Sequence, residues 1–499
     1  MMGKPCTYTY ILLSLAFIFV NLITLSNLTP WIDEVMMLDT SYNAAFHGVW
    51  ETTAWYRVVG EHPFSTYPPL YQMLAAVWMR VFGGSLVAVR SMNLLITFVL
   101  GGVFLRFIKR YKPQLSPWSI ALFTLLLWGS CDMSWMYRNG RPDMLCALIF
   151  VFSVQAIDNY LSSNRPVARI TVVITSAILL CSGIQAAIYL CALWLFLFFV
   201  MKQRRKEIVL LLALLLAGLM LGLFLVSLFM QVNGRLVAFA CSIVQYSATL
   251  SKIALVLLPL IGMMFGFDVL PYTQKLHELT TDLSLAQQLA TILESHDFII
   301  LAFIALTAYT TCFRNNLHKL LNDKGFLLLL YALYAPISMT LAGRFTIYYR
   351  WMIFLPLAAS IISIAARFRL WCAVFGVVAM VMSTFGIKSM LHDEHYCNDS
   401  LHSFVQRQHF KPSDAVVCPF SVFYEIKPVC DTCYFAGIYP IEFINHVDYI
   451  IEAPNGNEFD KPITNYVNNL KSDSSFILTA IDYCDCPSLT LYKVQKRHE

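Results

Sequence analysis

The chain has 499 residues, of which 58% are hydrophobic and 13% charged, and its mean hydropathy is +0.63. These values exclude a soluble globular protein and indicate an integral membrane protein. The formal net charge of +5 is small, and the lysines and arginines occur in short runs between apolar segments rather than on one basic surface. We therefore expect membrane lipids, and no nucleic acid, among its partners.

The first apolar segment, 8–25, follows Lys4, and its polar flank SNLTPWIDE lacks the small-residue cleavage site of a signal peptide. We expect this segment to be retained as the first membrane crossing, with the amino terminus in the cytoplasm. Residues 26–85 then contain the cations Arg57 and Arg80 against five acidic residues. Because lysine and arginine are retained on the cytoplasmic side, this loop is predicted to be extracytoplasmic.

Within that loop, the stretch 67–83 (YPPLYQMLAAVWMRVFG) is too short to cross a hydrocarbon core about 30 Å thick. It is expected to be a juxtamembrane helix at the outer interface. The alternation of basic clusters predicts eleven crossings in total. The predicted crossings are 8–25, 86–105, 116–133, 144–161, 170–200 (a hairpin broken near Ser182 and Gly183), 207–230, 298–312, 326–342, 351–366 and 370–387. The run 253–267 is expected to be re-entrant or interfacial, and 271–297 to be an external loop.

After Gly386 the composition becomes polar, so residues 388–499 are expected to form an extracytoplasmic domain separate from the transmembrane domain 1–387. Four segments rich in β-branched and aromatic residues predict short strands there: AVVCPFSVFY, VDYIIEA, SFILTAI and SLTLYKV. The predicted fold class is therefore an all-α polytopic bundle of about eleven transmembrane helices, followed by a small C-terminal α/β domain.

An even number of cysteines in this short outer domain favours disulfides, although the sequence cannot choose among fifteen connectivities. The candidates are Cys397, Cys418, Cys430, Cys433, Cys484 and Cys486. A zinc site built from the Cys-x-x-Cys and Cys-x-Cys pairs among them is the alternative. The Cys-x-Cys spacing suits a tetrahedral structural site poorly.

Two adjacent carboxylates, Asp33 and Glu34, follow the first crossing in the sequence TPWIDEV. Acidic residues at the mouth of a membrane bundle are costly and are often functional. Under the predicted topology, three further elements reach the same side. They are HPFSTYPPLY, with His62, Tyr67 and Tyr71, followed by Arg90; YRNGRPDML, with Arg141 and Asp143; and GRFTIYYRW, with Arg344, Tyr348, Tyr349 and Arg350. The sequence therefore predicts one outward-facing site.

This ordered set resembles the C-type (GT-C) glycosyltransferase superfamily, and within it family 39, which holds the dolichyl-phosphate-mannose-protein mannosyltransferases and the ArnT-like aminoarabinose transferases. The likeness lies in the DE pair, a PPLY helix that continues into FGGSLVAVRSMNLL, the R-x-D element, and an aromatic-basic loop followed by Pro356. It covers about the first 160 residues and, more weakly, 340–360. The resemblance implies the helical-bundle fold of the superfamily.

This resemblance implies that the protein takes a sugar from a polyprenyl- or dolichyl-phosphate carrier. The sugar is then expected to be transferred, with inversion, to a lipid, glycan or protein acceptor on the outer side. Asp33 matches the catalytic base of the family and Asp143 its second acidic residue, and Glu34 is placed to hold Asp33 or the acceptor. The candidates for stabilising the departing lipid phosphate are Arg90, Arg141, Arg344 and Arg350. The candidates for substrate binding are His62, Tyr67, Tyr71, Tyr348 and Tyr349. Aminoarabinose transferases carry a lysine where this chain has Tyr67, which argues against identical donor recognition.

Other roles stay open for the same residues. The Asp33–Glu34 pair suits the positive end of a helix dipole, Asp143 suits an N-cap, and the residues around Arg350 suit an interfacial aromatic belt. For the whole chain, the alternatives are a transporter or flippase of lipid-linked saccharides, which usually shows internal repeats that this chain lacks, and an assembly subunit. A divalent metal is open as a cofactor, with His62 beside Glu61 as a weak candidate. The expected location is the plasma (inner) membrane.

Overall fold

The computed structural model describes residues 4–52, 67–112, 115–163, 165–232, 292–314, 316–341, 347–392, 398–435, 446–454, 456, 460–485 and 487–496. Its contacts divide the chain into two compact units, which are described separately. Unit 1 comprises Met1–Asn21, Pro68–Tyr71 and Asn93–Leu391, and unit 2 comprises Leu22–Tyr67, Gln72–Met92 and His392–Glu499. The expectations for 253–267 and for most of 271–297 lie outside the described residues.

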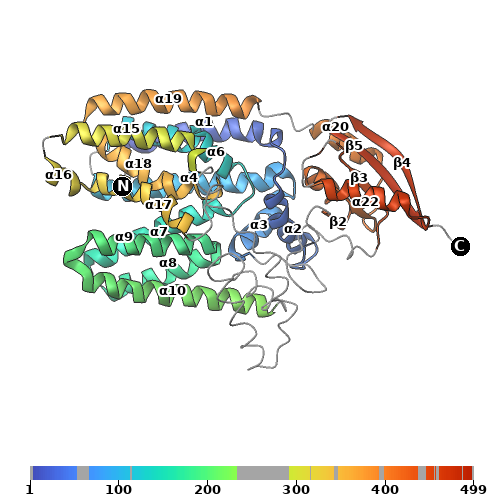
Figure 1. Ribbon diagram of the computed structural model, residues 1–499, viewed down its shortest axis with the longest axis horizontal. Helices are drawn as coiled ribbons and strands as arrows, with labels where there is room; N and C mark the ends of the chain where they lie inside the picture. The colour runs from blue at the N-terminus through green and yellow to red at the C-terminus, as the bar shows by residue number, and fades with distance from the viewer. Residues whose placement is uncertain are drawn as a thin grey trace. The chain divides into compact units, whose positions relative to one another are not determined.

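Helices occupy every range predicted as a crossing (Figure 1). They are α1 (Lys4–Thr24), α4 (Leu86–Tyr111), α5 (Pro117–Gly129), α6 (Cys131–Tyr137), α7 (Asp143–Ser163), α8 (Pro166–Ser182), α9 (Ile184–Val200), α10 (Arg205–Val232), α15 (His296–Cys312), α17 (Lys324–Leu341), α18 (Trp351–Ala365) and α19 (Arg369–His392). The predicted break in the hairpin 170–200 lies at Gly183. A short helix, α16 (Leu317–Leu321), precedes α17.

By length and composition, five helices of the described part of the chain are apolar and long enough to cross a membrane. The number becomes six if α5 and α6, which are bent by 64° at their junction, form one span. The other predicted crossings are shorter apolar helices. The structure thus supports a multi-pass membrane protein, and the count of eleven crossings stays a prediction.

The central helix of unit 1 is α18, in which every residue is buried. It packs against α5, α7, α15 and α17. A helix that is apolar on all sides is expected in such a position because no face prefers water. Since α18 begins directly after Arg350, its burial fixes the position of that residue and of the short 3-10 helix η3 (Ile347–Tyr349) before it.

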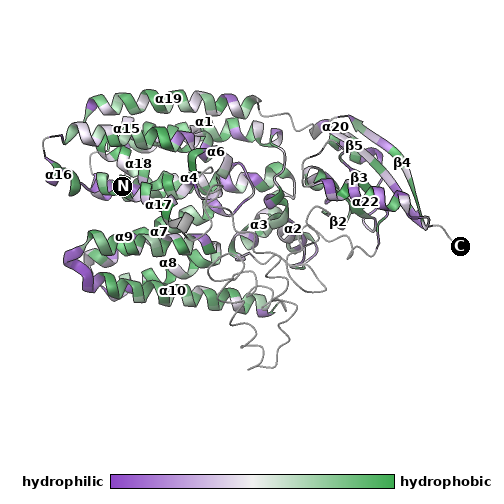
Figure 2. Ribbon diagram, in the orientation of Figure 1, coloured by the Kyte–Doolittle hydropathy of each residue, from purple (hydrophilic) through white to green (hydrophobic). Residues whose placement is uncertain are grey.

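Local sequence signals explain where several of these helices begin and turn. The Ser116 hydroxyl accepts a hydrogen bond from the Ser119 amide at 3.1 Å, and Pro117 occupies the first position of α5. A serine cap followed by proline is a typical helix start. The turn between α9 and α10 (Lys202–Arg204, η2) is hydrophilic between two apolar helices (Figure 2). A loop of this kind is expected to lie outside the hydrocarbon core.

Unit 2 contains a five-stranded mixed sheet in the order β2-β1-β3-β5-β4. The strands are β1 (Ala415–Val417), β2 (Thr432–Tyr434), β3 (Tyr449–Glu452), β4 (Phe476–Asp485) and β5 (Ser488–Lys496). β1 pairs in parallel with β2 and β3, whereas β5 pairs antiparallel with β3 and β4. The helices α20 (Asn398–Arg407), α21 (Phe423–Ile426) and α22 (Lys461–Ser472) accompany the sheet.

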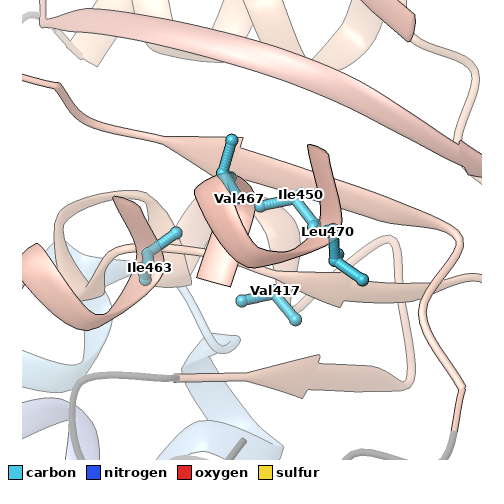
Figure 3. Close-up of a cluster of buried hydrophobic side chains, with 5 residues drawn as sticks. All are labelled: Val417, Ile450, Ile463, Val467 and Leu470. Carbon is cyan, nitrogen blue, oxygen red and sulfur yellow. The ribbon is translucent and has the colours of Figure 1, made fainter. Parts of the chain in front are cut away.

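Helix α22 covers one face of this sheet and encloses a small apolar core. Ile463, Val467 and Leu470 project from the helix onto Val417 of β1 and Ile450 of β3 (Figure 3). The helix is amphipathic, and its buried positions 463, 467 and 470 recur at the spacing of one helical face. The predicted small α/β fold of the tail therefore corresponds to a sheet with its own apolar core.

One predicted strand is mostly wrong, and one strand was missed. The segment predicted as a strand over 415–424 forms β1 only as far as Val417, after which Pro419 starts a 3-10 turn, η4 (Phe420–Val422), that leads into α21. Proline cannot donate to a sheet ladder and so ends the strand. The missed strand, β2, has three residues, which is too short for a recognisable alternation of side chains.

The remaining elements of unit 2 come from the first outer loop. They are η1 (Leu25–Asn27), α2 (Ile32–Phe46) and most of α3 (Leu70–Phe82), which is the helix predicted over 67–83. Helix α3 ends at Phe82 and is followed by Gly83, whose φ of 91° lies in the left-handed region that favours glycine. Helix α4 contributes its first residues, up to Met92, to this unit.

Candidate functional site

The acidic pair of the first outer loop lies in the first turn of α2. This helix begins at Ile32, directly after an extended Trp31, and the Trp31 amide donates a hydrogen bond to Glu34 Oε2 at 3.3 Å. Glu34 therefore caps α2, which was one of the alternatives for this pair. Acids in this turn also interact favourably with the positive end of the helix dipole.

Glu34 forms a fully buried ion pair with Arg90, since both side chains are 0% exposed. The guanidinium donates to both carboxylate oxygens, with Nη2 at 2.7 Å from Oε2 and Nε at 2.9 Å from Oε1. Its Nη1 also donates to the carbonyls of Leu25 and Leu28 at 2.7 Å each, and its Nη2 to that of Thr29 at 3.3 Å. Arg90, predicted to bind phosphate, therefore supports Glu34 and the chain before α2. A phosphate would have to displace these partners.

Asp33 differs from its neighbour in exposure. Its side chain is half-buried, whereas that of Glu34 is buried. Adjacent helical residues point about 100° apart, so anchoring Glu34 on Arg90 turns Asp33 toward another side of α2. A half-buried carboxylate is suited to meeting a ligand, because part of its surface is still accessible.

In unit 1, Arg141, Asp143 and Tyr348 come together. Arg141 Nε donates to Asp143 Oδ2 at 2.9 Å, and these two side chains are only 4% and 7% exposed. The guanidinium carbon of Arg141 also lies 3.6 Å from the ring centroid of Tyr348 in a cation–π contact. Asp143 is the first residue of α7, so the start of this helix positions the acid, as the N-cap alternative anticipated in part.

The loop that carries Arg141 is held by a residue that the sequence analysis missed. Asn93 Nδ2 donates to the Arg141 carbonyl at 2.9 Å and also to the Asn139 carbonyl. Its side chain is buried in α4, where an amide needs polar partners. An asparagine within the apolar run SMNLLITFVL was the signal that could have identified it.

A second ion pair in unit 1 joins Arg350 to Asp132, which was also missed. Arg350 Nη1 lies 2.6 Å from Asp132 Oδ1, and these side chains are 11% and 6% exposed. Within the described residues, Arg350 Nε and Asp132 Oδ2 are buried without a hydrogen-bond partner. The ring of Trp135, in α6, lies 5.1 Å from that of Tyr348. We call Asp132, Arg141, Asp143, Tyr348 and Arg350 the arginine cluster.

The other tyrosine candidates differ in exposure. Tyr71 and Tyr349 are buried, at 1% and 6% exposed, whereas Tyr67 is half-buried. Trp351 is 1% exposed and packs edge-on against the ring of Tyr189. An aromatic belt would expose these rings to lipid headgroups. Tyr349 and Trp351 instead contact protein, so the belt alternative does not describe them.

Four candidates, His62, Arg344, Cys397 and Cys486, lie outside the described residues. Among the residues that the structure does describe, no group of three or more His, Cys, Asp or Glu side chains could hold a metal ion. Because His62 lies outside the described residues, its candidacy as a metal ligand stays a prediction.

The four described cysteines of the tail are buried. Cys418 Sγ and Cys433 Sγ lie 3.1 Å apart, and both residues are 0% exposed. Burial raises the pKa of the Cys418 thiol well above its usual range and that of Cys430 to about 12. Cys484 is in β4. The disulfide assignment stays a prediction.

The chemistry that each group can support follows from its charges. In unit 2, Asp33 offers a half-buried carboxylate, which can accept a proton from a hydroxyl. In unit 1, the arginine cluster offers two guanidinium groups held by carboxylates, and fixed guanidinium groups stabilise developing negative charge on phosphate.

Comparison with known proteins identifies the fold. No family model matches the sequence, and no curated protein matches it. Two structures of ArnT from Cupriavidus metallidurans, one in the apo state and one bound to undecaprenyl phosphate, each align with a TM-score of 0.50 and 13% identity, covering 97% of both chains. The Archaeoglobus fulgidus oligosaccharyltransferase in complex with Zn and sulfate has a TM-score of 0.49 at 10% identity over 88% of this chain and 67% of that chain, and adds nothing to this conclusion. The chain thus shares the fold of ArnT. ArnT is a GT-C glycosyltransferase, and the motifs of this chain resemble the same superfamily.

Proposed function

We propose that this protein is a membrane glycosyltransferase that moves a sugar from a polyprenyl- or dolichyl-phosphate carrier to a lipid, glycan or protein acceptor on the extracytoplasmic side. The observation that carries the proposal is the fold shared with ArnT along 97% of both chains. One of those ArnT structures is bound to undecaprenyl phosphate, which is the carrier chemistry proposed here. The narrower assignment to family 39 rests on the DE, PPLY and R-x-D motifs.

Asp33 is proposed as the general base. The acceptor hydroxyl gives its proton to the Asp33 carboxylate as its oxygen bonds to the anomeric carbon of the sugar. The bond between that carbon and the phosphate oxygen breaks, and its electron pair stays on the lipid phosphate. Attack opposite the leaving group inverts the anomeric configuration. A positioned base contributes about 10²- to 10⁴-fold to such a step.

The arginine cluster is proposed to receive the lipid phosphate. Arg350 is the stronger candidate, because its Nε is a buried donor without a partner among the described residues. Asp143 is proposed to orient Arg141, since the two are joined at 2.9 Å. Arg344 belongs to the same sequence element as Arg350 and is kept as a third candidate. Arg90 is assigned to the support of Glu34 rather than to the phosphate.

The substrate contacts are proposed for Tyr67 and Tyr348, whose side chains are half-buried, together with His62. Tyr71 and Tyr349 are buried and are proposed to shape the surrounding protein. A divalent metal is kept as a candidate cofactor for these steps, and chelation in the same assay tests whether one is needed.

The test is transfer in isolated membranes supplied with polyprenyl-phosphate sugars, using the variant Asp33→Asn. We expect turnover to fall by about 10²- to 10⁴-fold, because asparagine cannot accept the proton. The protein level should be unchanged, since the half-buried Asp33 is replaced by a side chain of the same shape. Mass analysis of lipid-linked and envelope glycans from a strain lacking the protein identifies the sugar.

The matched control is Glu51→Gln, which removes a carboxylate from an exposed residue of the same outer loop. It should transfer sugar at the parental rate. Parental turnover by Asp33→Asn would remove Asp33 from the role of base. Equal loss in both variants would point to a general charge effect instead.

A further inference from the structure

A buried ion pair in unit 2 joins α2 to the turn that follows α21. Lys427 Nζ lies 3.0 Å from Asp39 Oδ1, and the two side chains are 1% and 0% exposed. The Thr52 hydroxyl donates to Asp39 Oδ2 at 2.7 Å, and Lys427 Nζ donates to the Asp431 carbonyl at 3.1 Å. Both charged groups are therefore paired with protein groups.

Weaker contacts join the same two segments. Lys427 Nζ lies 5.9 Å from the ring centroid of Tyr42, one turn after Asp39 in α2. His47, at the end of α2, lies 3.9 Å from the carboxylate of Asp431, but both of these groups are partly exposed. Exposed pairs contribute little. Of these three contacts, the buried pair Lys427–Asp39 is the strongest.

This ion pair is expected to fix the position of α2 rather than to add stability. Removing two charges from water offsets much of their attraction, so a buried ion pair adds little net stability, and its best-attested use is to specify a single arrangement. Lysine is also among the residue types that are almost never fully buried unless they are paired. A lysine that is 1% exposed and paired with a carboxylate on another element is therefore expected to fix how the two elements meet.

Two buried pairs act on α2 from different sides. At 3.6 residues per turn, the side chains of Glu34 and Asp39 point about 140° apart around the helix, and Asp33 lies about 100° from the first and about 120° from the second. Glu34 is held by Arg90 and Asp39 by Lys427. The helix cannot rotate without breaking one of these pairs, and its third side carries Asp33.

We propose that Lys427 is a positioning residue for the transfer reaction: through Asp39 it fixes the rotation of α2 and thereby the direction of Asp33. The proposal rests on the transferase function proposed above. It gives the C-terminal residues a role in catalysis, although Lys427 touches neither the donor nor the acceptor.

The decisive variant is Lys427→Met/Asp39→Asn, which removes both charges together. The asparagine keeps an oxygen for the Thr52 hydroxyl, and the methionine fills the space of the lysine stem. The single variant Lys427→Met leaves a buried carboxylate without its partner and is expected to lose folded protein. Lys461→Met, at an exposed lysine of the same unit, is the control.

Steady-state transfer by the full-length protein should separate positioning from binding. We expect the double variant to keep the parental melting temperature and the parental KM for the donor within about twofold, while kcat falls by about 10- to 100-fold, as misplacement of a reacting group predicts. Parental kcat in the double variant would overturn the proposal. A double variant that fails to fold would also overturn it, because the pair would then serve folding rather than position.

Hydrogen exchange of α2 tests, without any substrate, whether the pair Lys427–Asp39 holds this helix in place. The amides of this helix should exchange faster in the double variant than in the parent and in Lys461→Met. Unchanged exchange would refute the coupling even in an active transferase. If α2 exchanges faster in the double variant but the parent protein shows no transferase activity, the coupling stands and the proposed function is refuted. Failure of the coupling and failure of the proposed function are therefore distinguishable.

Discussion

Three acids of one helix have three different environments. Glu34 is buried against Arg90, Asp39 is buried against Lys427, and Asp33 is half-buried. A buried carboxylate requires a partner because its desolvation is costly, whereas a half-buried one can keep water or a ligand on its open side. The adjacent acids of the DE motif are thus separated by environment into one anchored group and one accessible group.

The first prediction concerns the anchored group. Glu34→Gln should lower the free energy of unfolding by about 3–5 kcal/mol, because it leaves the guanidinium of Arg90 buried without its counter-charge. Thermal unfolding of the purified protein in detergent measures the change. Glu51→Gln, at an exposed residue, should change the stability by less than about 0.5 kcal/mol. Equal melting of Glu34→Gln and the parent would show that the pair does not stabilise the fold.

At the scale of elements, α10 packs on α8 through glycines. A Cβ placed on Gly218 would lie 2.4 Å from the Val173 carbonyl oxygen, and one on Gly222 would lie 2.6 Å from that of Ala177. Glycines four residues apart let two membrane helices approach closely, which compensates for the absence of a hydrophobic driving force in lipid. The close contact therefore depends on the missing side chains.

The second prediction follows from this packing. Gly222→Val should destabilise the protein by about 1–3 kcal/mol, because the added carbons must push α8 away. Gly376→Val is the matched control, since a Cβ at that position of α19 meets no described atom within 4 Å. The melting temperatures of the two variants in detergent should differ, and equal values would contradict the packing.

The sheet supports a third prediction, that Cys418 and Cys433 form a disulfide in the mature protein. Their sulfur atoms lie 3.1 Å apart, with Cys418 directly after β1 and Cys433 in the neighbouring strand β2. Oxidation joins the two sulfurs and passes the two hydrogens, with their electrons, to the disulfide of a thiol–disulfide exchange catalyst. Burial raises the pKa of the Cys418 thiol, so thiolate is scarce near neutral pH and the bond should form during folding, before burial.

Mass analysis of peptides after alkylation under denaturing, non-reducing conditions measures this bond. We expect a linked peptide pair that disappears in Cys433→Ser and persists in Cys430→Ser. In the folded protein, alkylation of Cys430 should be slow at neutral pH and should accelerate only toward its raised pKa of about 12, as thiolate forms. Complete alkylation of both Cys418 and Cys433 in the unreduced protein would contradict the bond.

For the whole molecule, the proposed function depends on the predicted membrane topology. The acids and arginines can act on one substrate only if they face the same aqueous compartment. Of the exposed residues, Glu51 belongs to the loop predicted outside, and Cys131 lies near the outer end of the predicted crossing 116–133. Lys202 and Lys319 belong to segments predicted inside. Lysine and arginine in the segments 202–206 and 314–319 favour the inside assignment.

The corresponding experiment is labelling of intact cells or sealed vesicles with a membrane-impermeant thiol reagent. Native Cys131 should react from outside, and Glu51→Cys in a Cys131→Ser background should do the same. Lys202→Cys and Lys319→Cys should react only after permeabilisation. Labelling of Cys131 and Glu51→Cys from opposite sides would rule out a common site and with it the proposed transfer reaction.

The sequence alone predicted the helical framework well, for a physical reason. Hydropathy and charge act over the length of one helix, so the ranges of α1, α4, α7 and α10 and the hairpin break at Gly183 are visible in the chain itself. Three of the four predicted tail strands also correspond to β3, β4 and β5. The short β2 and the helix after Pro419 were not predictable, because pairing partners rather than local residues decide them.

The sequence by itself determined that this is a multi-pass membrane protein, and it identified Asp33, Arg141 and Arg350 as candidates for the proposed reaction. Only the tertiary structure decided which charged residues pair: Glu34 with Arg90, Asp132 with Arg350, and Asp39 with Lys427. The reason is distance along the chain, since the first two pairs join residues 56 and 218 positions apart. No periodic pattern spans such separations, and the pairing of buried charges is fixed by how the elements pack.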